Sequence, residues 1–134
     1  MFRKIEHIGI AVKSLETANA MFKELAEAQL LKIETVESEG VRTSFFQVGE
    51  TKIEFLESTK EGSSIEKFIE KRGEGIHHIA FEVQNIEAEL VRLQDLGFQL
   101  INTVPKDGAD NKRIAFLHPK STNGILVELC EENN

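Results

Sequence analysis

Residues 5–12 read Ile5-Glu6-His7-Ile8-Gly9-Ile10-Ala11-Val12, and residues 76–83 repeat the pattern as Ile76-His77-His78-Ile79-Ala80-Phe81-Glu82-Val83. Apolar residues alternate with small or polar ones in both segments, which predicts a β-strand in each. His7 and His78 hold the same place in the two strands. We therefore expect a duplicated unit with one histidine in each copy.

Each copy also ends in a strand that carries a glutamate. Lys52-Ile53-Glu54-Phe55-Leu56 matches Leu126-Val127-Glu128-Leu129-Cys130, so the glutamates repeat at nearly the same interval as the histidines. By alternation, both glutamates point to the strand face opposite the helix, as the two histidines do. Imidazoles and carboxylates together suit cobalt, manganese, nickel or zinc better than calcium. The sequence therefore predicts a divalent metal site made of His7, Glu54, His78 and Glu128.

The rest of each copy has the pattern of one helix and further strands. Ser14 and Asn85 are good N-caps, they repeat at the same interval as the histidines, and an apolar stripe follows each of them. Residues 58–74 link the copies and contain the spacing of a short helix. We predict strands at residues 4–12, 31–37, 41–48 and 51–57, and at residues 76–83, 98–103, 112–117 and 124–130.

These elements predict an α+β fold of two tandem βαβββ modules. We expect one domain over residues 1–134, with modules at about 1–60 and 75–134. Its eight strands would form an open, barrel-like sheet around the metal site.

Composition and charge exclude several classes of protein. The chain has 134 residues, of which 40% are hydrophobic and 29% charged, which is ordinary for a globular domain with a sizeable core. The net charge of −7 argues against a general nucleic-acid or anionic-membrane binder. No apolar run approaches a membrane span, and the single cysteine, Cys130, suits a reducing compartment. We expect a cytoplasmic protein without nucleic-acid or membrane partners.

The chain resembles the vicinal oxygen chelate superfamily, also called the glyoxalase superfamily, and within it the methylmalonyl-CoA epimerase family. The resemblance covers nearly the whole chain and rests on residues 5–12, 75–80 and 113–129. Its most particular part is Phe116-Leu117-His118-Pro119-Lys120, followed by Gly124-Ile125-Leu126-Val127-Glu128-Leu129. The resemblance implies the paired βαβββ fold around a divalent metal. It also implies a homodimeric isomerase that interconverts (R)- and (S)-methylmalonyl-CoA by metal-assisted proton transfer at C2.

The resemblance also assigns roles to residues of the site. It places the metal ligands at the four residues predicted above, with Gln or Glu expected at the position of Glu54. Glu128 is our first candidate for the catalytic base, because a carboxylate beside the metal also lies beside the carbon acid, and Glu54 is the second. Some epimerases have a glutamate proposed as a base on the strand that here contains Thr43 and Ser44, where this chain has no acid.

The substrate contacts and the type of activity leave alternatives open. Four basic residues could meet the phosphates of coenzyme A, although a solvated basic face would look the same: Lys106, Lys112, Arg113 and Lys120. A glyoxalase-type metal-dependent lyase also moves a proton at a metal-bound enediolate. A non-catalytic small-molecule binding protein can share the fold, but it would not need four matched ligands. An iron dioxygenase would use two histidines and one carboxylate, so Glu54 counts against it.

Overall fold

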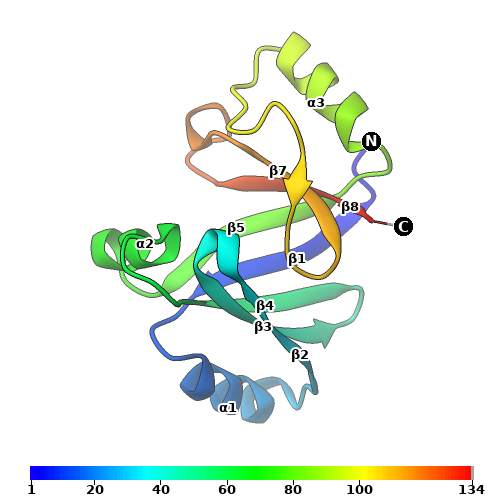
Figure 1. Ribbon diagram of the computed structural model, residues 1–134. Helices are drawn as coiled ribbons and strands as arrows, with labels where there is room; N and C mark the ends of the chain where they lie inside the picture. Colours follow the sequence, from blue (N-terminus) through cyan, green and yellow to red (C-terminus); the bar gives the residue numbers. More distant parts are fainter. Residues whose placement is uncertain (134) are drawn as a thin grey trace. The chain divides into compact units, whose positions relative to one another are not determined.

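The computed structural model describes residues 1–133 and shows a mixed sheet of eight strands with three α-helices in that part of the chain (Figure 1). The hydrogen-bonded strand order is β2-β3-β4-β1-β5-β8-β7-β6. The helices are α1 (Leu15–Ala26), α2 (Ser64–Arg72) and α3 (Ile86–Asp95). The strands are β1 (Lys4–Ala11), β2 (Leu30–Val36), β3 (Val41–Val48), β4 (Thr51–Ser58), β5 (Gly75–Glu82), β6 (Lys106–Asp107), β7 (Lys112–Leu117) and β8 (Val127–Glu132).

The element order confirms the predicted α+β fold with a βαβββ unit used twice. The chain forms two compact units. One is His7–His77, and the other combines Met1–Glu6 with the segment from His78 onward. Strands β1 and β5 each contribute residues to both units. None of the helices within residues 1–133 combines the length and the apolar character needed to cross a membrane.

In the unit His7–His77, helix α1 covers one face of the strands. β1 pairs in parallel with β4, and β3 pairs antiparallel with both β4 and β2. The Ser14 side chain accepts a hydrogen bond from the Thr17 backbone amide at 3.2 Å, which confirms the predicted N-cap. Leu15 packs with Phe46 and Phe55 in the core beneath the helix. Because the apolar side chains pack beneath the helix, the opposite strand face carries the polar residues His7 and Glu54.

Helix α2 confirms the short helix predicted in the linker between the copies. The Ser63 hydroxyl accepts a hydrogen bond from the Glu66 amide at 3.1 Å and so caps its first turn. Ile65, which is 1% exposed, packs against Ala11 and Leu56. The linker therefore buries apolar surface of its own.

The other unit repeats the arrangement with α3. β5 pairs in parallel with β8, and β7 pairs antiparallel with both β8 and β6. The Asn85 side chain accepts a hydrogen bond from the Ala88 amide at 3.0 Å, so the second predicted N-cap is also confirmed. Leu90 and Leu93 pack with Leu129 in the core beneath this helix.

The prediction of a strand over residues 98–103 is wrong. That segment makes only an isolated bridge between Leu100 and Leu117, and the sixth strand is the two-residue β6 further along. The Asn102 side-chain oxygen accepts the Phe116 amide at 2.8 Å, at a place where a strand would offer a backbone carbonyl. A side-chain acceptor thus replaces part of the backbone ladder.

The last strand begins later than predicted. Residues 124–126 were expected to be its start, but Gly124 has a φ of +81° and the Ile125 amide donates to the Thr122 carbonyl at 3.1 Å. These contacts hold residues 122–125 in a turn, so β8 starts at Val127.

Candidate metal centre

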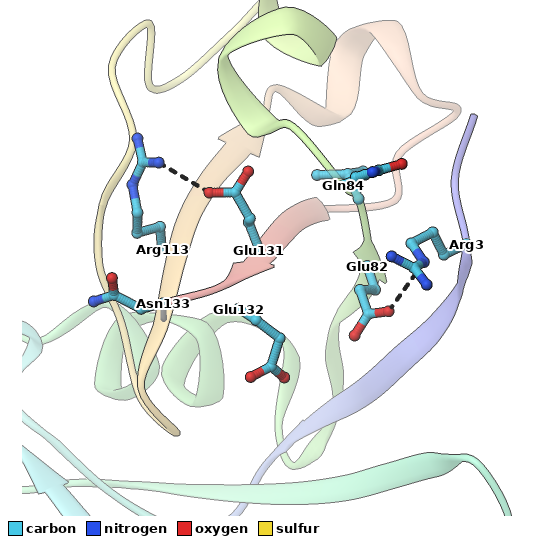
Figure 2. A pocket seen from close by; sticks show the side chains of 8 residues that line it. Arg3, Glu82, Gln84, Arg113, Glu131, Glu132 and Asn133 are labelled. Atoms are coloured by element: carbon cyan, nitrogen blue, oxygen red, sulfur yellow. Dashed lines mark hydrogen bonds and ion pairs between the residues drawn. The ribbon is translucent and has the colours of Figure 1, made fainter.

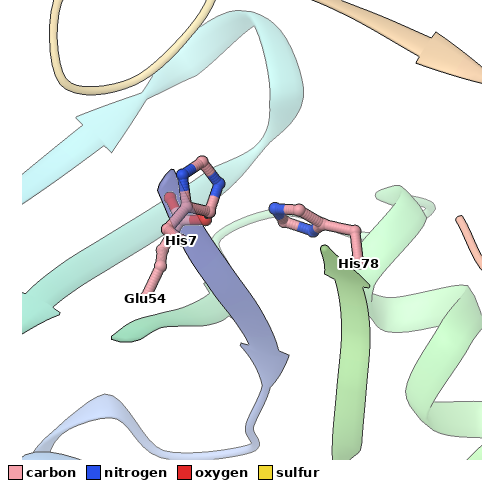
Figure 3. A group of neighbouring side chains, drawn as sticks. All are labelled: His7, Glu54 and His78. Atoms are coloured by element: carbon pink, nitrogen blue, oxygen red, sulfur yellow. The ribbon is translucent and has the colours of Figure 1, made fainter. Parts of the chain in front are cut away.

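The first half of the predicted site lies on β1 and β4. These strands pair in parallel with Gly9 beside Glu54, and His7 lies two residues before Gly9 on the same face. The His7 Nε2 and Glu54 Oε1 atoms are 3.4 Å apart, and the two side chains are 7% and 5% exposed. Figure 3 shows these two side chains projecting from neighbouring strands. One buried imidazole and one buried carboxylate thus form a pair in this unit.

The second half has the same construction on β5 and β8. Ala80 lies beside Glu128 in the parallel pairing, and His78 lies two residues before Ala80. The His78 Nε2 and Glu128 Oε1 atoms are also 3.4 Å apart, with side chains 3% and 6% exposed. The sequence repeat is therefore a repeat of geometry within each unit.

Each pair has the donor atoms and the spacing of two adjacent metal ligands. Two ligands about 2.1 Å from one ion, on neighbouring coordination positions, lie about 3 Å apart. The observed 3.4 Å in both pairs is close to this separation. Burial of a carboxylate is costly unless a partner compensates its charge, and a divalent metal ion held by the pair would compensate it.

One phenylalanine lies beside each histidine–glutamate pair, and the sequence analysis identified neither of them. Phe45 lies directly opposite Glu54 across β3 and β4, and Phe116 lies directly opposite Glu128 across β7 and β8. The Phe116 ring also meets the His78 ring edge to face, with centroids 5.9 Å apart. Phe116 follows Phe45 at the same interval in the sequence as His78 follows His7, and this repeat is the signal that could have found them.

Strand β3 carries no acid near the first pair. The Ser44 hydroxyl donates to the Asn19 side chain of α1 at 2.6 Å, so it faces the helix side. Thr43 is 1% exposed, alternates with Ser44, and therefore shares the face of Phe45. On this face, β3 therefore offers a threonine hydroxyl and no carboxylate.

The structure places two of the predicted substrate-contacting cations among carboxylates. The Lys112 ammonium is 2.5 Å from Glu132, and the Arg113 guanidinium is 2.9 Å from Glu131. Arg113 also contacts Glu87, and this hydrogen bond lowers the pKa of Glu87 and raises the pKa of Arg113. Both cations therefore have structural partners.

The other two predicted cations are exposed. Lys106 lies on β6 opposite Ile114 of β7, and Lys120 lies in a short 3-10 turn, Pro119–Ser121, beyond the end of β7. The His118 Nδ1 accepts the Lys120 amide at 3.1 Å, so this histidine caps the turn.

A polar pocket of about 620 Å³ lies in the unit that contains His78 (Figure 2). Its charges are largely paired, since Arg3 lies 3.7 Å from Glu82 and Arg113 lies 2.9 Å from Glu131. Among the described residues that line it, none belongs to a histidine–glutamate pair. The lining residues are Arg3, Glu82, Val83, Gln84, Arg113, Glu131, Glu132 and Asn133.

Cys130 is buried beside the second pair, where it packs with Ala80 and Ile114. Burial raises the pKa of its thiol, and the nearby Glu128 charge raises it further. The thiol group lies 3.5 Å from the Phe81 carbonyl, to which it donates. A thiol that stays protonated at neutral pH packs as a small apolar group.

Comparison with known proteins identifies relatives that match most of the chain. The family model described as the Glyoxalase/Bleomycin resistance protein/Dioxygenase superfamily matches residues 6–116. The uncharacterized protein YqjC of Bacillus subtilis is 43% identical over 128 residues, covering 96% of this chain and 91% of that protein. The ethylmalonyl-CoA/methylmalonyl-CoA epimerase of Cereibacter sphaeroides is 40% identical over 131 residues, covering 96% and 98%. A solved methylmalonyl-CoA epimerase in complex with methylmalonyl-CoA and NH4+ superposes with a TM-score of 0.94 at 32% identity, covering 98% and 96%.

Proposed function

Because the chain belongs to the glyoxalase/bleomycin resistance protein/dioxygenase superfamily and, within it, to the methylmalonyl-CoA epimerase family, we propose that it is an isomerase that interconverts (R)- and (S)-methylmalonyl-CoA. The observation that carries this proposal is the match to the Cereibacter sphaeroides epimerase, which covers 98% of that protein. The two histidine–glutamate pairs supply the metal ligands and the carboxylates that such a proton transfer requires. The glyoxalase-type lyase and the non-catalytic binding protein have no comparable support.

We propose that the two pairs together hold one divalent metal ion, with His7, Glu54, His78 and Glu128 as ligands. The matching 3.4 Å separations within the two pairs support this proposal. When bound, the ion would act as a Lewis acid for the negative charge that develops on the thioester oxygen. The mixed nitrogen and oxygen donors suit cobalt, manganese, nickel or zinc.

The chain's own carboxylates supply the proton chemistry in this proposal. C2 of the substrate lies between a thioester and a carboxylate, so its proton is acidic, and inversion requires its removal from one face and its return to the other. We assign the first base to Glu128 and the second to Glu54, one from each module. Both carboxylates are buried, which strengthens their electrostatic interaction with a substrate bound beside them. Thr43 offers only a hydroxyl, so it does not serve as the second base.

We propose that basic residues of the second module meet the phosphates of coenzyme A. Lys106 and Lys120 are exposed and support this directly. Lys112 and Arg113 belong to the same proposal, although each would have to share its present carboxylate partners with the phosphates. We further propose that the chain is a single domain that works in the cytoplasm as a homodimer.

The test of the proposed activity is exchange of the C2 proton with solvent. The purified protein is incubated with methylmalonyl-CoA in D₂O, and deuterium at C2 and the enantiomer ratio are followed by mass spectrometry and chiral analysis. We expect deuterium in the product as the enantiomers interconvert. Propionyl-CoA, which lacks the second carbonyl group, should not exchange. Failure to exceed the background of a His7→Ala/His78→Ala double variant would reject the function.

A further inference from the structure

Phe116 borders the second histidine–glutamate pair and is only partly buried. It is directly opposite Glu128 in the antiparallel pairing of β7 and β8, where side chains on one face come within about 5 Å at Cβ. Its ring meets that of His78 at 89°. His78 and Glu128 are buried, whereas Phe116 is only partly buried. The Phe116 ring therefore presents an apolar surface beside the polar pair.

The position of Phe116 is fixed by its neighbours. Its amide donates to the Asn102 side chain at 2.8 Å, and its carbonyl accepts the Ile101 amide at 2.8 Å. Its side chain packs against the cluster of Ala80, Ile114 and Cys130. Because both the backbone and one side of the ring are held in place, Phe116 can form a rigid part of a binding site.

The equivalent residue of the first half-site differs. Phe45 is 1% exposed, and the Lys32 ammonium lies over its ring, 5.6 Å from the centroid. The protein itself thus covers Phe45. Of these two equivalent phenylalanines, Phe116 is the one whose ring remains partly accessible to a ligand.

We propose that Phe116 determines which acyl groups the enzyme accepts, by contacting the alkyl substituent at C2 of the substrate. This inference rests on the proposed epimerase function. The groups flanking C2 are polar and suit the metal and the carboxylates, whereas the alkyl substituent is apolar and suits an aromatic ring. One methylene in an apolar pocket changes kcat/KM by roughly 10- to 200-fold. A fixed ring at this place would discriminate a methyl from an ethyl substituent.

The test compares methylmalonyl-CoA with ethylmalonyl-CoA in wild-type protein, Phe116→Leu and Phe116→Ala. We expect the ratio of kcat/KM for ethylmalonyl-CoA over methylmalonyl-CoA to rise about tenfold in Phe116→Ala and less in Phe116→Leu. Phe98→Ala is the matched control, because Phe98 is another partly buried phenylalanine of this unit but packs in the core with α3. Its ratio should stay within about twofold of wild type.

The outcomes separate this inference from the function on which it rests. If both Phe116 variants lose activity equally on the two substrates, Phe116 only supports His78 and the inference is wrong. The leucine variant keeps the test valid if the alanine variant does not fold. A wild-type protein that epimerises neither substrate would reject the proposed function, and the inference with it. Wild-type activity with an unmoved ratio would reject the inference alone.

Discussion

Glu54 and Glu128 each lie between a small residue and a phenylalanine on the neighbouring strands. The small residue comes from the parallel partner strand and the phenylalanine from the antiparallel one. The small residue leaves space for the carboxylate and for the histidine diagonal to it, and the phenylalanine places an apolar ring beside the carboxylate. The two sets are Gly9, Glu54 and Phe45, and Ala80, Glu128 and Phe116.

Replacing Glu128 by glutamine tests its role as the base. Glutamine keeps an oxygen that can ligate weakly but cannot accept the proton, so we expect a fall in epimerisation on the order of 10²-fold or more. The measurement is kcat at saturating metal. Recovery of most activity at high metal concentration would show that Glu128 is only a ligand.

The same change at Glu54 tests the assignment of two bases. With one base removed, exchange of the C2 proton should persist from one enantiomer while interconversion is lost, because the remaining base still serves one face. Deuterium exchange and epimerisation are therefore measured separately, starting from each enantiomer. Symmetric losses for both glutamate variants, reversed by added metal, would mean that another group moves the proton.

Metal content tests the ligand assignment without any activity assay. We expect about one divalent ion per chain after gentle purification, and loss of most of it in His78→Ala, because one ligand of four is removed. His77→Ala is the control, since the neighbouring His77 ring packs edge to face on Phe68 instead. Full metal retention by His78→Ala, measured by elemental analysis, would contradict the assignment.

At the scale of elements, each ligand-bearing strand also holds the start of its helix. Glu57, three residues beyond Glu54, accepts the first amide of α1, that of Leu15, at 2.6 Å. Glu131, three residues beyond Glu128, accepts the first amide of α3, that of Ile86, at 3.0 Å. A negative charge at a helix N-terminus is favourable, so each contact stabilises both the helix and its position on the strand. Each carboxylate also faces an arginine on the adjacent strand, Arg42 at 3.8 Å and Arg113 at 2.9 Å.

Neutralising either capping glutamate should destabilise the fold modestly. We expect Glu57→Gln and Glu131→Gln each to lower the free energy of unfolding by about 0.5 to 1 kcal/mol, because a charge-assisted contact becomes a neutral one. Urea denaturation measures this. Glu61→Gln, at an exposed glutamate outside the helices, should change stability by less than about 0.5 kcal/mol. Equal effects in all three variants would argue against the capping role.

At the scale of the whole molecule, we predict a homodimer. The eight strands of one chain supply two modules and all four proposed ligands, so the dimer is not needed to complete the site. Light scattering at micromolar concentration should report twice the mass of the 15.1 kDa chain. A purely monomeric species at that concentration would contradict the prediction.

The sequence by itself determined the duplicated fold and the pairs within it. Period-two alternation decides which strand face a residue occupies, and one face of each sheet must be buried under a helix. These two local rules put His7 and Glu54 on one face of their unit, and His78 and Glu128 on one face of theirs. The N-caps Ser14 and Asn85 were equally predictable, because a cap depends only on neighbours in the chain.

The tertiary structure alone decided what depends on register between strands. Phe45 and Phe116 stand opposite the glutamates only because β3 and β7 pair in one particular register, which alternation does not specify. The contact of Asn102 also depends on register, because its side chain accepts the Phe116 amide in place of a backbone carbonyl, and the strand predicted over residues 98–103 does not form. Register also decides the partners of Lys112 and Arg113, which lie directly opposite carboxylates of β8. Such partners are distant in the chain, and only hydrogen-bonded pairing brings them within reach.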